Sequence, residues 1–296
     1  MRIAVLSTST RDVAPIINPL QRMGFPVTIF YDKLTREQQE NEILPTLVNI
    51  EPEYVVMVGA IEKYFNAPVP SSLLLKKINE RFKTILICFD AGDYPWHVEI
   101  EKYHANKCFT LITSIDGSRV NGGISGLSPI DELPYGDPYP WNERNIIFGF
   151  AGNIGYGPRK QIIQDLTLNG DLTLFAPHCD DDFYVKFVKS CKGIINHPMT
   201  GSGEAEHVKG RVVQAGLAGS VLFEKLGPTR EWFVPGKDYF EYETLRDVQI
   251  GLDWLKSSPE EAEEMAANLR QKVIRDHTPI PFWTRVFSQA DEARLR

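Results

Sequence analysis

The sequence predicts an α/β protein with two halves, each built on a parallel β-sheet. Short runs rich in Val, Ile, Leu and Phe alternate with amphipathic segments along the first 116 residues. A stretch rich in Gly, Pro, Ser and Asp, residues 117–144, interrupts this pattern, and the alternation then restarts. Buried parallel strands have such continuous apolar runs, and their alternation with helices indicates βαβ units.

The first half opens on the β-branched run RIAVLST at residues 2–8, which is typical of a central parallel strand. Gly24 marks the end of the helix that follows it, and a serine precedes the last helix of this half. Further strands are expected at 24–32, 54–59, 84–90 and 108–114, and helices at 12–23, 35–49 and 71–81.

The density of proline and glycine in residues 117–144 cannot continue a helix or the interior of a sheet. We therefore expect two domains, residues 1–140 and 141–296, each Rossmann-like. In the second, strands are expected at 145–152, 171–177, 192–197 and 220–225, and helices at 158–168, 182–191, 206–218, 244–257 and 259–276.

The composition excludes some classes of function. A formal net charge of −7 makes a general affinity for nucleic acid or an anionic membrane unfavourable, because both need a basic surface. The start of the chain has no secretory apolar region, and no apolar run is long enough for a membrane span. The four cysteines are Cys88, Cys108, Cys179 and Cys191, and no two of them have CxxC spacing. We therefore expect a cytoplasmic protein with free thiols.

Ligands of open parallel sheets bind beyond the carboxyl ends of the strands. In one such segment, AGNIGYGPR at residues 151–159, three glycines separate a strand from a helix. A glycine-rich turn at a helix N-terminus suits an anion, and Arg159 adds a positive charge, although a simple turn would also need glycine. The spacing is not that of a dinucleotide-binding fingerprint, which argues against a dehydrogenase.

A second such segment is GEAEHVKGRVVQAGLAGSVLFE at residues 203–224. Here Lys209 and Arg211 are expected in the first turns of a helix, where the helix dipole disfavours cations. Their position is understandable if an anion such as a diphosphate binds there, since Lys supplies a point charge and Arg a fork of donors. The alternative is a solvated charged turn.

These motifs resemble those of the GT-B glycosyltransferases. The run from His207 to Tyr242 is similar to the spore-maturation-protein-like group, in which a Lys/Arg-Gly-Arg segment precedes a Trp-Phe-x-Pro-Gly motif. VIRDHTPIPFWTRVF, FAGNIGYGPRKQIIQDL and ICFDAGDYPWHVEIEKYHANKCFTLITSIDG resemble further segments of that group.

The resemblance implies the GT-B architecture, with two Rossmann-like domains facing across a cleft, an N-terminal acceptor domain and a C-terminal nucleotide-sugar domain. It implies that Lys209 and Arg211 neutralise the diphosphate of the donor. The other donor-binding residues that we predict are Gly152, Asn153, Gly155, Arg159, Glu206, His207 and Gln214.

Many members of this family have two glutamates in an E-x7-E pair. Glu206 and Gln214 have that spacing here, but the second acid is replaced by glutamine. A glutamine can still bond to a ribose hydroxyl. The replacement puts a retaining mechanism in doubt.

An inverting transfer needs a base for the acceptor hydroxyl. Asp93 is our first choice for that base and Asp90 our second, since both follow the expected strand 84–90 together with His97. The alternative is that Asp90 caps the next helix. The histidines His104, His197 and His277 lack ligand spacing and are read as structural, although His197 and His207 could face the donor.

The acidic segment HCDDDF at residues 178–183 could hold a divalent cation, but acids are also favoured where a helix begins. We expect no metal and no cofactor.

The sequence therefore predicts a glycosyltransferase that moves a sugar from a nucleoside-diphosphate sugar to an unidentified glycan, lipid-linked glycan or protein acceptor. The alternatives are a nucleotide-sugar epimerase or hydrolase of the same fold and a non-catalytic nucleotide-sugar-binding or scaffold protein.

Overall fold

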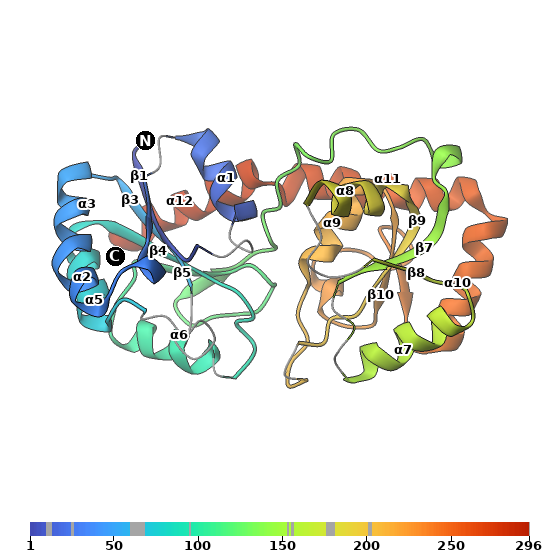
Figure 1. Ribbon diagram of the computed structural model, residues 1–296, viewed down its shortest axis with the longest axis horizontal. Helices are drawn as coiled ribbons and strands as arrows, with labels where there is room; N and C mark the ends of the chain where they lie inside the picture. The colour runs from blue at the N-terminus through green and yellow to red at the C-terminus, as the bar shows by residue number, and fades with distance from the viewer. Residues whose placement is uncertain are drawn as a thin grey trace. The chain divides into compact units, whose positions relative to one another are not determined.

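The computed structural model describes residues 1–9, 14–24, 27–59, 69–94, 96–152, 154, 157–175, 181–200 and 203–295. The chain forms two compact units, unit 1 (Met1–Asp131 with Pro279–Arg296) and unit 2 (Glu132–Thr278). Each contains one parallel sheet with helices on both faces (Figure 1), so the predicted α/β fold class with two Rossmann-like halves is confirmed.

The sheet of unit 1 has the strand order β2-β1-β3-β4-β5-β6, and every pairing is parallel. Its strands are β1 (Ile3–Ser7), β2 (Val27–Phe30), β3 (Tyr54–Val58), β4 (Lys83–Cys88), β5 (Leu111–Ser114) and β6 (Gly123–Ser125). Its helices are α1 (Ala14–Met23), α2 (Arg36–Gln38), α3 (Leu44–Ile50), α5 (Ser72–Arg81), α6 (Trp96–Ala105) and α12 (Pro279–Leu295), with short helices η2 (Tyr31–Lys33) and η3 (Gln39–Ile43).

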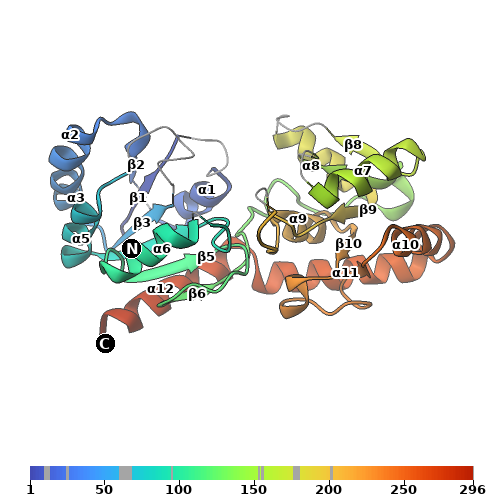
Figure 2. The same ribbon diagram turned by 90° about the horizontal axis from the view of Figure 1, so that it is seen from below.

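Alternate residues of the central strands bury opposite faces of this sheet. On one face Ala4 and Leu6 of β1 pack in a core with residues of α3, α5 and α6. On the other face Ile3 and Val5 share a core with α1 and with Trp283 of α12. Figure 2 shows α12 alongside the strands that it covers. A buried strand needs apolar residues on both faces, which explains the uninterrupted run at residues 3–6.

The sheet of unit 2 has the order β11-β10-β9-β7-β8, again with parallel pairs. Its strands are β7 (Ile146–Ala151), β8 (Thr173–Phe175), β9 (Cys191–Asn196), β10 (Val221–Lys225) and β11 (Phe240–Tyr242). Its helices are α7 (Gly157–Leu168), α8 (Asp181–Ser190), α9 (Gly210–Ala218), α10 (Leu245–Ser257) and α11 (Pro259–Asp276), with η4 (Trp141–Glu143) and η5 (Pro228–Glu231).

Helices α7 and α10 share a core with β7, β9 and β10, while α9 packs closely against α11. A Cβ atom at Gly216 of α9 would lie 2.6 Å from Cγ2 of Val273 in α11. The small residues of QAGLAGS therefore permit a helix–helix approach that a larger side chain would prevent.

The structure corrects the predicted domain division. The division falls at Asp131 instead of residue 140, and residues 279–296 belong to unit 1 instead of the second domain. The sequence pattern predicts a last helix that ends at Asp276, but α12 follows and supplies Trp283 and Phe287 to the core of unit 1. Helix α6 and strands β6 and β11 are further elements that the pattern does not predict.

Candidate donor site

The carboxyl ends of β7, β9 and β10 and the start of α9 bring together most of the predicted donor-binding residues of unit 2. Helix α9 begins at Gly210 with Lys209 as its N-cap, which corrects the predicted start at residue 206. Glu206 instead forms an antiparallel bridge with Met199, and the His207 backbone N–H donates to the Pro198 carbonyl at 3.1 Å. Glu206 and His207 thus lie on a folded loop after β9, ahead of the helix.

Arg211, in the first turn of α9, joins the ends of two strands. Its Nε donates to the Ala151 carbonyl at 2.6 Å, and its Nη1 donates to Oδ1 of Asn196 at 2.8 Å. The guanidinium also lies over the Phe150 ring, 4.9 Å from its centroid. These contacts fix the guanidinium plane beside the turn that follows β7.

Gly152 makes room for this guanidinium. Its φ is +135°, and a Cβ atom there would lie 2.4 Å from Nη2 of Arg211. The structure thus gives Gly152 a role in placing Arg211, and its predicted contact with the donor stays a prediction. Asn153 and Gly155, predicted beside it, lie outside the described residues.

Glu224, at the end of β10, is a buried acid that sequence reasoning missed. Its Oε2 accepts from Nδ2 of Asn196 at 2.7 Å and its Oε1 accepts from Oγ1 of Thr229 at 3.1 Å. Asn196 therefore connects Glu224 to Arg211. Burial raises the pKa of Glu224 from 4.5 to about 7, and the bonds from Asn196 and Thr229 only partly oppose this. The sequence signal that could have identified Glu224 is its position directly after the apolar run VLF of an expected strand.

Positive charges gather around His197, which follows β9 and is buried. Burial, followed by the charges of Lys225, Arg159 and Lys209, lowers the pKa of His197 from 6.5 to about 4. Arg159 is itself buried on α7, and Nζ of Lys209 contacts Nε2 of His207. Glu206 balances one of these charges through an ion pair with Lys225, at 3.5 Å. The region is cationic in a protein whose net charge is −7.

Gln214 lies on α9, one turn beyond Arg211. Its Oε1 accepts from the Tyr184 hydroxyl of α8 at 2.6 Å. Gln214 also forms a side-chain hydrogen bond with the buried Tyr135, so its amide already has two partners within unit 2.

The acidic segment 178–183 is only partly described. Asp181 and Asp182 occupy the first turn of α8 and are exposed, where acids interact favourably with the helix dipole. His178, Cys179 and Asp180 lie outside the described residues. The described cysteines Cys88, Cys108 and Cys191 are buried free thiols.

The two predicted base candidates lie in unit 1, in the segment after β4. Asp93 is buried, and its backbone N–H donates to the Asp90 carbonyl at 2.9 Å. Asp90 has a left-handed backbone, with φ of 46°. Helix α6 begins only at Trp96, so Asp90 is not its N-cap, which rules out the capping alternative. Asp116, which the sequence pattern does not single out, holds this turn by accepting from the Ala91 N–H at 2.8 Å.

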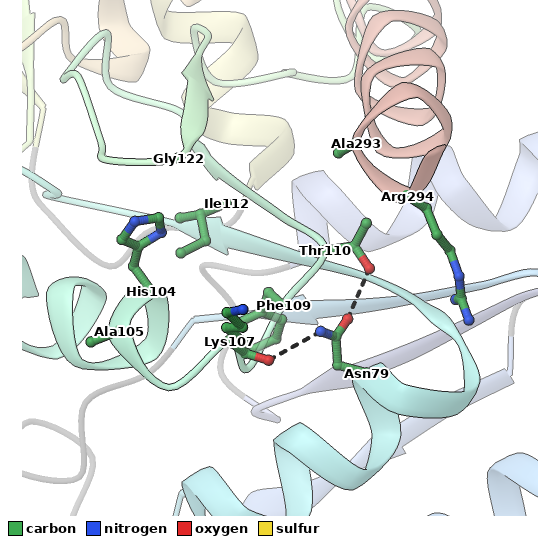
Figure 3. A pocket seen from close by; sticks show the side chains of 10 residues that line it. All are labelled: Asn79, His104, Ala105, Lys107, Phe109, Thr110, Ile112, Gly122, Ala293 and Arg294. Carbon is green, nitrogen blue, oxygen red and sulfur yellow. Dashed lines mark hydrogen bonds between the residues drawn. The ribbon is translucent and has the colours of Figure 1, made fainter. Parts of the chain in front are cut away.

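A separate cavity lies elsewhere in unit 1. It has a volume of about 550 Å³ and lies where β5 and β6 begin, beside the ends of α5, α6 and α12 (Figure 3). Asn79 lines one side of this cavity, where it donates to the Lys107 carbonyl and accepts from the Thr110 hydroxyl. Its lining includes His104 but no predicted donor-binding or base residue.

Residues 142–286 match the family described as "Glycosyl transferase-like". The chain carries a glycosyl transferase-like domain. The matched segment spans the sheet of unit 2 and therefore contains the Arg211, Glu224 and His197 contacts described above. The predicted resemblance to glycosyltransferases is confirmed.

Solved glycosyltransferases share the fold over nearly the whole chain. A glycosyltransferase from Rickettsia africae is 9% identical, with a TM-score of 0.65, and the match covers 99% of this chain and 98% of that chain. HepE from Anabaena in complex with UDP-glucose is 11% identical, with a TM-score of 0.64 and coverages of 99% and 100%. Sucrose-phosphate synthase from Thermosynechococcus elongatus is 10% identical, with a TM-score of 0.62 and coverages of 99% and 100%.

At these identities the likeness establishes the fold, and the chain has the predicted GT-B fold. A comparison with curated protein sequences found no match. Within the described part of the chain, no helix combines the length and apolar character that crossing a membrane requires.

Proposed function

We propose that this glycosyltransferase uses a nucleoside-diphosphate sugar as its donor and binds it in unit 2 without a metal ion. The observation that carries the proposal is the set of cations around the start of α9, namely Lys209, Arg211 and Arg159. Negative charge grows on the leaving diphosphate during glycosyl transfer, and fixed cations and helix N–H groups stabilise such charge. HepE, a relative in fold, has been solved with UDP and with UDP-glucose, which supports a donor of this class.

The cationic set also gives a reason for metal independence. A divalent cation would neutralise the diphosphate in a site that lacks basic side chains, whereas here these residues already supply positive charge. The acceptor is proposed to be a glycan, a lipid-linked glycan or a protein.

The first experiment is a thermal-shift screen against UDP, GDP, CDP, ADP, dTDP and their common sugar conjugates, with MgCl2 and with EDTA. A ligand at 100 times its dissociation constant stabilises the folded state by about 2.7 kcal/mol. We expect one nucleoside diphosphate to raise the melting temperature equally in both conditions. No shift with any nucleotide would contradict the proposal, and a shift only with MgCl2 would contradict metal independence. Binding without donor turnover would favour a non-catalytic role.

We further propose Asp93 as the base that takes the acceptor proton if the transfer inverts. It is buried at the carboxyl edge of the unit 1 sheet, where a fixed carboxylate can be held ready. Asp93→Asn is expected to lower turnover by roughly 10²- to 10⁴-fold, the usual contribution of a general base, with unchanged donor affinity. Asp90→Asn is the matched comparison. A large loss in Asp90→Asn alone would assign the base to Asp90 instead.

A further inference from the structure

One ring nitrogen of His197 accepts a hydrogen bond, and the other has no partner among the described residues. The imidazole follows β9 and has only 2% of its surface exposed. Its Nδ1 accepts the Met199 backbone N–H at 3.2 Å, so Nδ1 carries no proton. The neutral ring therefore carries its proton on Nε2, which is a hydrogen-bond donor.

Nε2 of His197 is buried and makes no hydrogen bond to any group in the described part of the chain. A buried donor without an acceptor is unfavourable, so native proteins almost always satisfy such groups. The unsatisfied N–H therefore leaves this site open to an acceptor that the described residues do not supply.

The surroundings of His197 determine which kind of acceptor fits. The nearby charges that act on the ring are those of Lys225, Arg159 and Lys209, all of them cations. They disfavour a second proton on the ring, which stays neutral at neutral pH and keeps its single N–H. The same cations favour an anionic oxygen over a neutral one.

We propose that the Nε2–H of His197 donates a hydrogen bond to a phosphate oxygen of the nucleoside-diphosphate donor. This inference rests on the proposed function. It adds a directional hydrogen bond from a neutral ring to the charged side chains that are proposed to bind the diphosphate. Lys209 and Lys225 attract the diphosphate from a distance, whereas the imidazole N–H fixes the position of one oxygen.

Two substitutions test the hydrogen bonds of the two ring nitrogens of His197 separately. In His197→Asn, the amide oxygen can still accept the Met199 N–H, but no donor reaches the position of Nε2. In His197→Gln, the longer amide places an N–H near that position. Calorimetric titration uses inorganic pyrophosphate, the nucleoside diphosphate that gives the largest shift in the screen above, and its parent nucleoside.

We expect His197→Asn to weaken binding of pyrophosphate and of the nucleoside diphosphate roughly 10-fold or more, the usual effect of a lost bond to a charged group. Affinity for the nucleoside should not change, and His197→Gln should retain most of the wild-type affinity. Equal affinities in His197→Asn and wild type would overturn the proposal and would assign the Nε2–H to a bound water.

A measurement on the wild-type protein covers the case in which His197→Asn does not fold. In protein with ¹⁵N-labelled histidine, the Nε2 resonance of His197 should report a protonated nitrogen and should move when pyrophosphate is added. A resonance that does not move while pyrophosphate binds would contradict the proposal. If wild-type protein binds none of the nucleotides, the proposed function itself fails, which is a different outcome from unaffected binding in His197→Asn.

Discussion

Lys209 and Arg211 are neighbours in the sequence, but the structure gives them different roles. Arg211 donates to Ala151 and Asn196 and lies over Phe150, so its side chain also connects β7 to β9. Replacing it would remove packing and leave the Ala151 carbonyl without this donor, which would confuse a binding test. Lys209, as the N-cap residue without a side-chain cap bond, is the better position for testing charge.

We expect Lys209→Met to weaken nucleoside-diphosphate affinity by about tenfold, or ~1.4 kcal/mol, because one charge-assisted contact is lost. The salt dependence of binding should also become shallower. Calorimetry at two ionic strengths measures both effects. Lys256→Met, at an exposed position on α10, is the control and should bind as wild type. Equal affinity in the two variants would remove the electrostatic argument for this site.

The raised pKa of Glu224 predicts how the stability of the protein changes with pH. Its pKa is raised from 4.5 in the unfolded chain to about 7 in the folded protein. The folded state therefore holds this proton more tightly, and the stabilisation is complete below pH 4.5 and is lost as the pH rises through 7.

Relative to Glu224→Gln, the wild-type protein should lose on the order of 3 kcal/mol of unfolding free energy between pH 4.5 and pH 8. Urea unfolding of both proteins at several pH values measures this difference. His197 titrates in the opposite sense, because its lowered pKa gives stability above pH 6.5 that is lost toward pH 4. Both proteins contain His197, so its contribution cancels in the comparison. A difference that is constant with pH would show that Glu224 is ionised throughout.

At the scale of elements, Gly152, which directly follows β7, meets two separate structural requirements. Gly152 adopts a φ of +135° and also leaves room for the Arg211 guanidinium. Gly170, after α7, adopts a φ of +75°, and a Cβ atom there would have no other atom within 4 Å. Substitutions at Gly170 and Gly152 therefore distinguish the effect of backbone strain from the effect of displacing Arg211.

We expect Gly170→Ala to lower stability by about 1 kcal/mol, because alanine is strained at positive φ, and to leave nucleotide affinity unchanged. Gly152→Ala should lower stability further and weaken nucleoside-diphosphate binding, because its Cβ displaces Nη2 of Arg211. Thermal unfolding and calorimetry on both variants give the comparison. If Gly152→Ala binds as tightly as Gly170→Ala, the position of Arg211 has no influence on the ligand.

At the scale of the whole molecule, the two ends of the chain build one unit. Helix α12 covers one face of the unit 1 sheet, where Trp283 is fully buried with Val5 and Ile17. Unit 2 is made of the continuous segment Glu132–Thr278. A defect in α12 should therefore affect the stability of unit 1 first.

Trp283→Ala should cost about 3–5 kcal/mol, as large-to-small substitutions in a core do. Hydrogen exchange with mass spectrometry should show faster exchange in β1, β3 and α1, with little change in β7 and β9. Ile280→Ala, at a largely exposed position on the same helix, is the control. Equal acceleration in both units would show that they unfold together.

The sequence by itself determined the alternation of strands and helices, both parallel sheets, and the segments at the strand ends where the predicted donor site lies. These features depend on local periodicity, on turn residues and on the rule that parallel sheets bind at their carboxyl edge. The E-x7-E spacing of the resembled family singled out Gln214 as a donor-binding residue, which stays a prediction; in the structure its side chain accepts from the Tyr184 hydroxyl.

Only the tertiary structure decided which residues surround these positions. Helix α9 starts later than the predicted residue 206, because the preceding residues pair in the loop after β9. Helix α12 follows unit 2 in the sequence but belongs to unit 1. Its apolar residues pack in the core on one face of the unit 1 sheet. The link from Glu224 through Asn196 to Arg211 joins residues from three elements, and the unpaired nitrogen of His197 is defined by burial. Both depend on long-range packing, which short-range patterns in a sequence do not encode.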